Sequence, residues 1–177
     1  MSRFDKRNLQ DHLKHLSKEE LEKEITVLFQ KFPKVRNYYE QELSDDPLAL
    51  INKFKKEIYK CYFPKTGKGR RKNAAIRRVI SSFKDVSSSK YDLADLLLYR
   101  VKTGLLCYTD PSAQVEMNKA SMQALINSCK EASLLIRHHQ LKNFTEKEIN
   151  SILEICTENA PEYDPFIFEV KSIITTI

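Results

Sequence analysis

The sequence predicts an all-α fold: a single domain over residues 1–177, built as a helical array of eight or nine helices in a bundle or a short α-superhelix. Glycine occurs only three times and proline six times, whereas a β-rich chain needs many more turn residues. Apolar side chains recur at helical spacing along most of the chain. At 41% hydrophobic and 31% charged residues, a chain of this length has enough apolar material for one core.

Capping boxes mark three expected helix starts. In this motif a serine or threonine oxygen accepts a backbone N–H three residues on, and the acidic side chain found there reaches back to the cap. The pairs with this spacing are Ser17 with Glu20, Ser89 with Asp92, and Thr145 with Glu148.

Aspartate followed by proline is the second helix-start signal. Proline suits the first helical position, and it keeps the residue before it out of the helical region, where an N-cap aspartate belongs. The three pairs are Asp46-Pro47, Asp110-Pro111 and Asp164-Pro165. Each is expected to begin a helix.

These signals and the apolar periodicity together define the expected helices. We place eight of them near residues 8–15, 18–32, 34–43, 47–63, 70–85, 90–108, 112–139 and 146–158. The ninth segment, 165–176, is rich in strand-prone residues. A strand needs a partner strand, and no other segment offers one, so we expect a helix there too.

The segment 90–108 is expected to be the buried centre of the array. Its leucines, with Ala94 and Val101, cover most of the helix circumference, and a helix that is apolar nearly all round is buried on most sides. The segment 112–139 is expected to form a helix about 40 Å long that packs nearby.

Positive charge is concentrated in one part of the chain. The net charge is +6, and the segment 60–84 contains no acidic residue. Its basic residues are Lys60, Lys65, Lys68, Arg70, Arg71, Lys72, Arg77, Arg78 and Lys84. A concentrated patch of one sign repels itself and therefore favours an anionic partner or full solvation.

The basic segment is the strongest functional indication in the sequence. Clustered arginines and lysines bind phosphate oxygens, so we expect this corner to dock a polyanion, either RNA or DNA. The candidate contacts are Lys65, Lys68, Arg70, Arg71, Arg77 and Arg78. Two alternatives stay open: an acidic protein partner, or a face that is solvated or paired internally with acids such as Asp92 and Asp95.

Two further hypotheses concern function. One is a protein-interaction or scaffold module that uses helix grooves or the acidic C-terminal third. The other is an enzyme with a site near Asp92, Asp95 and Arg100, in which Arg100 is a candidate buried partner for one of the aspartates. No catalytic residue, metal ligand or cofactor is assigned, because the familiar motifs for them are absent.

Cysteine usage and the N-terminal residues suggest a compartment. The four cysteines are widely spaced without a Cys-x-x-Cys pair, and no signal-like apolar segment opens the chain. We therefore expect reduced thiols in the cytoplasm. No apolar run is long enough to cross a membrane, and the oligomeric state stays open.

Several stretches resemble a bacterial domain-of-unknown-function family, the 6155 type. They are Leu13-Lys14-x-Leu16-Ser17-Lys18-Glu19-Glu20-Leu21, Phe32-x-x-Val35-x-x-Tyr38-Tyr39, Lys56-x-Ile58 with Phe63-Pro64, Gly69-Arg70-Arg71-Lys72, and Asp92-Leu93-Ala94-Asp95-Leu96-Leu97-Leu98-Tyr99. The resemblance covers roughly residues 10–110. It implies a small bacterial cytoplasmic protein and no mechanism.

Overall fold

The computed structural model describes residues 6–43, 46, 48–64, 73–112, 117–158 and 164–177. Every regular element in these ranges is an α-helix, and there are nine of them. The predicted all-α class is therefore confirmed. The chain divides into two compact units, Met1–Asp45 and Asp46–Ile177, which are described separately, and one domain over 1–177 stays a prediction.

Most helix bounds lie close to the expected segments, but the helices expected at 112–139 and 146–158 begin at other residues. The first unit holds α1 (Lys6–Lys14), α2 (Lys18–Lys31) and α3 (Pro33–Glu42). The second unit holds α4 (Ala49–Tyr62), α5 (Asn73–Val86), α6 (Lys90–Thr109), α7 (Lys119–His139), α8 (Lys142–Glu158) and α9 (Pro165–Thr175).

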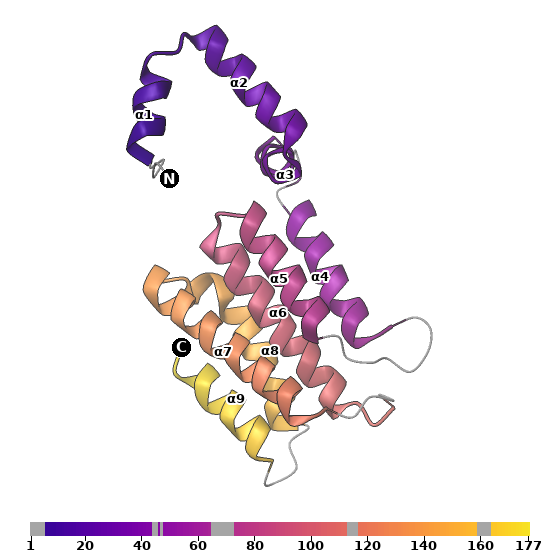
Figure 1. Ribbon diagram of the computed structural model, residues 1–177. Coiled ribbons are helices and arrows are strands. Elements are labelled where there is room, and N and C mark those ends of the chain that lie inside the picture. The colour runs from indigo at the N-terminus through magenta and orange to yellow at the C-terminus, as the bar shows by residue number, and fades with distance from the viewer. Residues whose placement is uncertain (1–5, 44–45, 47, 65–72, 113–116, 159–163) are drawn as a thin grey trace. The chain divides into compact units, whose positions relative to one another are not determined.

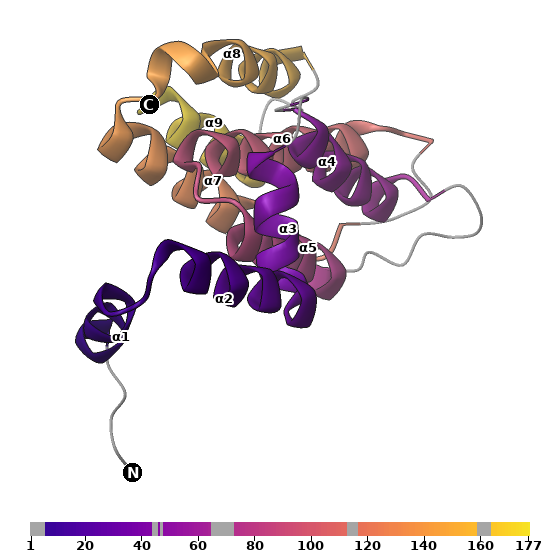
Figure 2. The same cartoon turned by 90° about the horizontal axis from the view of Figure 1, so that it is seen from above.

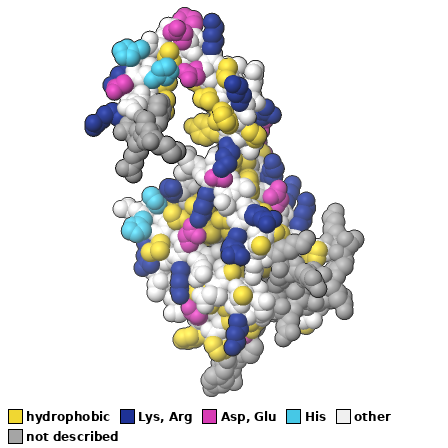
Figure 3. Space-filling model, in the orientation of Figure 1, with side chains coloured by type: hydrophobic (Ala, Val, Ile, Leu, Met, Phe, Trp, Pro, Cys, Tyr) yellow, Lys and Arg dark blue, Asp and Glu magenta, His cyan; other side chains and the backbone are white. Residues whose placement is uncertain are grey.

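The first unit confirms the capping box at Ser17. The Ser17 hydroxyl accepts the Glu20 N–H at 3.2 Å, and the Glu20 carboxylate accepts the Ser17 N–H at 2.8 Å. The apolar side chains of α2 gather along it (Figure 3), yet no residue of α1 or α2 is buried. Instead, α2 and α3 pack through aromatic rings, with the Phe29 and Tyr39 centroids 6.4 Å apart.

The second unit is organised around α6, as the sequence predicts. Figures 1 and 2 show α6 among its neighbours, and it packs against α4, α5, α7 and α8. Twelve of its 20 residues are buried. Because hydrophobic burial supplies most of the driving force for folding, the burial of α6 on several sides makes it the core of this unit.

A close approach in the core lies between α6 and α7, at Gly104. A Cβ added there would come within 2.6 Å of both terminal methyl groups of Leu125. Leu125 is itself only 1% exposed, so its side chain has little room to move. The absence of a side chain at position 104 therefore allows α7 to pack closely on α6.

Two of the predicted helix starts after α6 are wrong. Asp110-Pro111 does not begin α7; the Asp110 carboxylate instead accepts the Ser112 N–H at 2.8 Å, which forms a local turn. The start of α7 is capped by Asn118, whose side chain accepts the Ser121 N–H at 2.9 Å. The helix is therefore shorter than the expected 112–139.

Thr145 lies inside α8 rather than at its start. The preceding helix ends at Gln140, which adopts a left-handed conformation with φ of 54°. The chain can then turn at once into α8, so Leu141 O accepts the Thr145 N–H at 3.2 Å. The Thr145 hydroxyl donates to the same carbonyl at 3.1 Å and forms no cap.

The remaining caps agree better with the sequence. Ser89 caps α6 by accepting the Asp92 N–H at 3.1 Å. Asp46 accepts the Leu48 N–H at 2.9 Å just before α4, while Pro47 lies outside the described residues. None of the described helices is both long enough and apolar enough to cross a membrane.

Asp164-Pro165 begins α9 as predicted and also ties it to α6. One carboxylate oxygen of Asp164 accepts the N–H groups of Phe166 and Ile167, at 2.9 and 3.2 Å. The other accepts the Tyr108 hydroxyl at 2.5 Å. This hydrogen bond, followed by burial and the charge of Asp164, raises the pKa of Tyr108 to about 12.

Gly104→Ala tests the close approach of α6 and α7. Overpacking a core typically costs 1–3 kcal/mol, and the better helix propensity of alanine offsets about 1 kcal/mol. We expect a net loss of about 1 kcal/mol in urea unfolding. In a Leu125→Ala background the same substitution should become neutral or stabilising, and an unchanged loss there would contradict the contact.

The Tyr108–Asp164 bond predicts a loss of stability in alkali. The folded-state pKa lies above the ordinary value of 10.0, so between about pH 10 and pH 12 the unfolded chain loses the Tyr108 proton first. The unfolding free energy should therefore fall through this window. Tyr108→Phe should show a shallower fall in urea unfolding, and an equally steep one would rule out the bond.

Candidate functional site: a basic helix face and the adjoining groove

Two of the predicted phosphate contacts, Arg77 and Arg78, lie in α5 and are exposed. The opposite face of α5 is buried through Ile76, Ile80 and Phe83, and this spacing turns the two arginines outward. The other four predicted contacts, Lys65, Lys68, Arg70 and Arg71, lie outside the described residues.

Arg77 and Arg78 take part in none of the ion pairs found in the described part of the chain. Nearby lysines behave differently: Lys84 pairs with Glu131, and Lys55 pairs with Asp95 at 2.7 Å. The internal pairing of the arginine face with Asp95 that the sequence left open is therefore not seen for these two residues.

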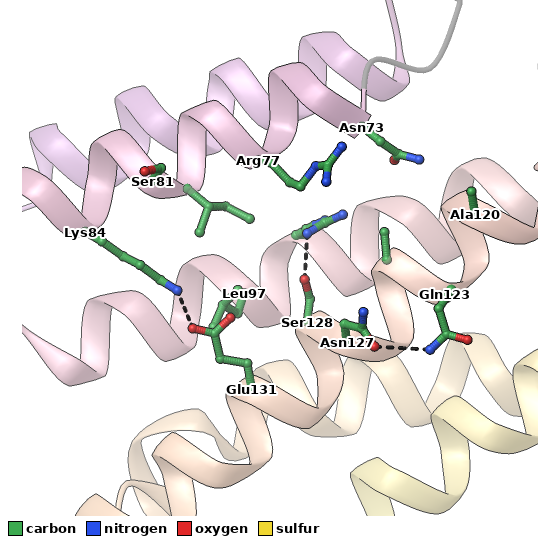
Figure 4. A pocket seen from close by; sticks show the side chains of 13 residues that line it. Asn73, Arg77, Ser81, Lys84, Leu97, Ala120, Gln123, Asn127, Ser128 and Glu131 are labelled. Carbon is green, nitrogen blue, oxygen red and sulfur yellow. Dashed lines mark hydrogen bonds and ion pairs between the residues drawn. The ribbon is translucent and has the colours of Figure 1, made fainter.

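Beside this face, α5, α6 and α7 enclose a groove of about 660 Å³. We call it the α5–α7 groove. Its size lies within the range typical of sites for small ligands. Figure 4 shows it from close by, with side chains from all three helices directed into it. Its lining residues are Asn73, Arg77, Ile80, Ser81, Lys84, Leu97, Arg100, Ala120, Gln123, Ala124, Asn127, Ser128 and Glu131.

The floor of the α5–α7 groove carries a buried charge, Arg100. This residue is only 4% exposed. Its Nη1 donates to the Ser128 hydroxyl at 2.7 Å, but its Nε and Nη2 are buried and donate no hydrogen bond. A guanidinium keeps its charge in proteins, and a buried charge without full pairing is costly. Arg100 therefore keeps two donors that no group in the described part of the chain satisfies.

The rim of the groove adds further positive charge. Figure 4 shows Arg77 projecting from α5 over the groove, while Lys84 and Glu131 pair across it. The Lys84–Glu131 pair is neutral, so the ionised groups of the groove sum to about +2, from Arg77 and Arg100. Positive charge on low-dielectric walls concentrates anions from solution.

Neutral polar groups complete the α5–α7 groove. Gln123 donates to the Asn127 side chain at 3.1 Å along α7, and Asn73 donates to the Ser121 hydroxyl at 2.9 Å. Asn73 is also the first residue of α5, and Ala120 is the second of α7. The positive ends of two helix dipoles thus lie beside the groove.

Asp95 and Arg100, two of the three residues of the predicted enzyme site, turn toward different neighbours. Asp95 turns toward α4, where its carboxylate accepts Lys55 Nζ at 2.7 Å and the same Nζ lies 5.4 Å from the Tyr99 ring centroid. Arg100 turns toward α7 and Ser128. Arg100, the candidate partner for one of the aspartates, pairs with neither of them; for Asp95 the reason is that five residues of helix place the two side chains on different sides.

The sequence analysis did not predict the residues of α7 that line the groove. Small and amide side chains recur there at helical spacing, and together they mark one helix face: Ala120, Gln123, Ala124, Asn127, Ser128 and Glu131. A face of small residues beside amides indicates a shallow surface rather than a core stripe. This pattern on α7, together with an arginine in the leucine-rich α6, is the sequence feature that indicates the groove.

One family model matches the chain, over residues 4–164; it describes a family of unknown function, DUF6155. No curated protein and no solved structure matches it significantly. The match extends beyond the predicted resemblance at both ends. Because the function of the family is unknown, only the geometry of the site provides evidence on function.

The Lys55–Asp95 pair generates a stability prediction. Both side chains are largely buried, at 21% and 11% exposure, so Lys55→Met leaves a buried carboxylate without its partner. We expect a loss of about 2 kcal/mol in urea unfolding, partly recovered by adding Asp95→Asn. Lys130→Met is the matched control: it breaks the exposed pair with Glu169 and should cost under about 1 kcal/mol.

Proposed function

The chain belongs to the DUF6155 family, whose function is unknown, and we propose that it is a non-catalytic binding module that docks nucleic acid, RNA or DNA, on the basic face of α5. The observation that carries this proposal is the state of Arg77 and Arg78: both are exposed and unpaired among the described residues, although acids elsewhere in the unit pair with lysines.

The chemistry of arginine supports a phosphate ligand for this face. An exposed guanidinium presents a planar fork of donors that fits phosphate oxygens. Arg77 and Arg78 belong to the basic segment 60–84, which contains no acidic residue. A strand of nucleic acid offers regularly spaced charges, so a row of cations binds it largely without regard to sequence.

The same proposal places the protein in the cytoplasm. The four cysteines are in the thiol form, and three of them are buried. Burial, as the largest cause, raises the pKa of Cys129 to about 12 and also raises that of Cys156. Thiols held protonated in this way are unreactive and suit a reducing compartment.

The salt dependence of binding tests the proposal. Each phosphate contact on duplex DNA contributes about −0.9 to the slope of log affinity against log salt. Arg77→Gln with Arg78→Gln should therefore make the slope shallower by about 1.8. Fluorescence anisotropy with labelled duplex DNA and single-stranded RNA, at several salt concentrations, measures it.

The control for this test removes the same charge elsewhere. Lys142→Gln with Lys147→Gln alters exposed residues of α8 and lowers the net charge equally. If the control weakens binding as much as the α5 variant, the effect comes from net charge alone and the proposed face is wrong. Binding of neither nucleic acid by the unaltered protein would also overturn the proposal.

A further inference from the structure

We propose that the α5–α7 groove is a binding site for a small phosphate monoester, with Arg100 as the residue that holds the phosphate group. The proposal goes beyond nucleic-acid docking on the outer face of α5, because it assigns a separate ligand to the interior of the groove. It rests on the buried guanidinium, the charge of the groove and the nature of its walls.

The first step is the hydrogen-bonding state of Arg100. A buried side chain normally satisfies its donors, and Arg100 satisfies only Nη1, through Ser128. Nε and Nη2 remain without a partner and with almost no exposed surface, on a residue that lines the groove, so a ligand reaches them after a small rotation of the guanidinium or of the side chains that cover it. An arginine can donate both nitrogens of its fork to two oxygens of one anion. A tetrahedral oxyanion on the groove floor would satisfy the guanidinium.

The second step is the charge that the groove can neutralise. Its ionised groups sum to about +2, because the Lys84–Glu131 pair cancels and Arg77 and Arg100 remain. A phosphate monoester carries about −1.5 to −2 near neutral pH, whereas a carboxylate carries only −1. The groove therefore matches a phosphate better than a carboxylate.

The third step concerns the rest of the ligand. Beyond the two arginines the groove has apolar walls from Ile80, Leu97 and Ala124, and amide groups from Gln123 and Asn127. A volume of about 660 Å³ exceeds what a bare phosphate ion needs, since sites of this size hold drug-sized molecules. The ligand should therefore carry an organic group that contacts the walls and hydrogen-bonds to the amides.

The experiment measures thermal unfolding of the full chain with inorganic phosphate and with adenosine 5′-monophosphate, a phosphate monoester. Sodium chloride and acetate at equal ionic strength are the comparison salts. At 100 times the dissociation constant, a ligand should raise Tm by about 5–11 °C. We expect both phosphates to do so, the monoester at the lower concentration, and acetate to have no such effect.

Phosphate also stabilises proteins generally, because it is excluded from their surfaces. The decisive quantity is therefore the difference between the protein and Arg100→Met, which keeps an unbranched apolar stem and removes the fork. This variant should lose the specific rise in Tm. Without ligand it should be at least as stable as the parent, because an incompletely paired buried charge is gone.

Arg77→Gln is the second variant, and it alters an exposed residue, so its folding is not at risk. It should weaken monoester binding at least fivefold by isothermal titration calorimetry. Arg78→Gln is the matched control, because Arg78 does not line the groove; it should leave monoester binding unchanged and weaken nucleic-acid binding.

The outcomes separate the two proposals. Loss of monoester binding in Arg100→Met with nucleic-acid binding retained supports the groove site. Equal stabilisation by phosphate in Arg100→Met and the parent protein would overturn it, as would binding of acetate as tight as that of the monoester. Failure of nucleic-acid binding alone would remove the proposed function and leave the groove site standing.

Discussion

The burial of α6 is the constraint on which the second unit depends. A helix surrounded by α4, α5, α7 and α8 must be apolar on most sides, and it must be narrow where a neighbour comes close, as at Gly104. Any charge that it carries must also find a partner inside the protein, because water is excluded there. Asp95 and Arg100 are the two buried charged residues of α6, and they have different kinds of partner.

Asp95 and Arg100 are both partly satisfied: Asp95 Oδ1 and Arg100 Nε and Nη2 are buried without a hydrogen bond, but only Asp95 has an oppositely charged partner. The carboxylate of Asp95 accepts Lys55 across the α4–α6 contact, so the charge helps to join two helices. Arg100 faces a groove and keeps two donors unused. Natural proteins tolerate such costs mainly where a ligand repays them, and we interpret Arg100 in that way.

The architecture could be predicted from the sequence because the apolar pattern of one segment, α6, shows that other helices must surround it. An all-round apolar segment has few alternatives to burial, so residues 90–108 were recognisable as the centre. The caps were less secure. Ser17, Ser89 and Asp164 start helices as expected, but Asp110 satisfies its carboxylate in a turn, and Thr145 is drawn inside α8 because Gln140 ends α7 so sharply. A capping motif in the sequence therefore does not by itself show which backbone groups its side chain will hydrogen-bond.

The groove could not be derived in the same way, because it needs three helices at once. Arg100 is conspicuous among leucines, yet the sequence offers only an aspartate on the same helix as a candidate partner, whereas the structure gives it Ser128 on α7. The amides of Gln123 and Asn127 become meaningful only when α7 lies across α6 from α5. Pairings between distant segments are set by packing, which a single sequence does not display.

The most direct test observes the Arg100 side chain itself. In an ¹⁵N-edited NMR spectrum, the Nε–H signal of Arg100 can be assigned by its disappearance in Arg100→Met. If the groove floor holds a phosphate group, this signal should shift progressively and saturate as a phosphate monoester is added. A signal that stays in place while the monoester binds elsewhere would contradict the account.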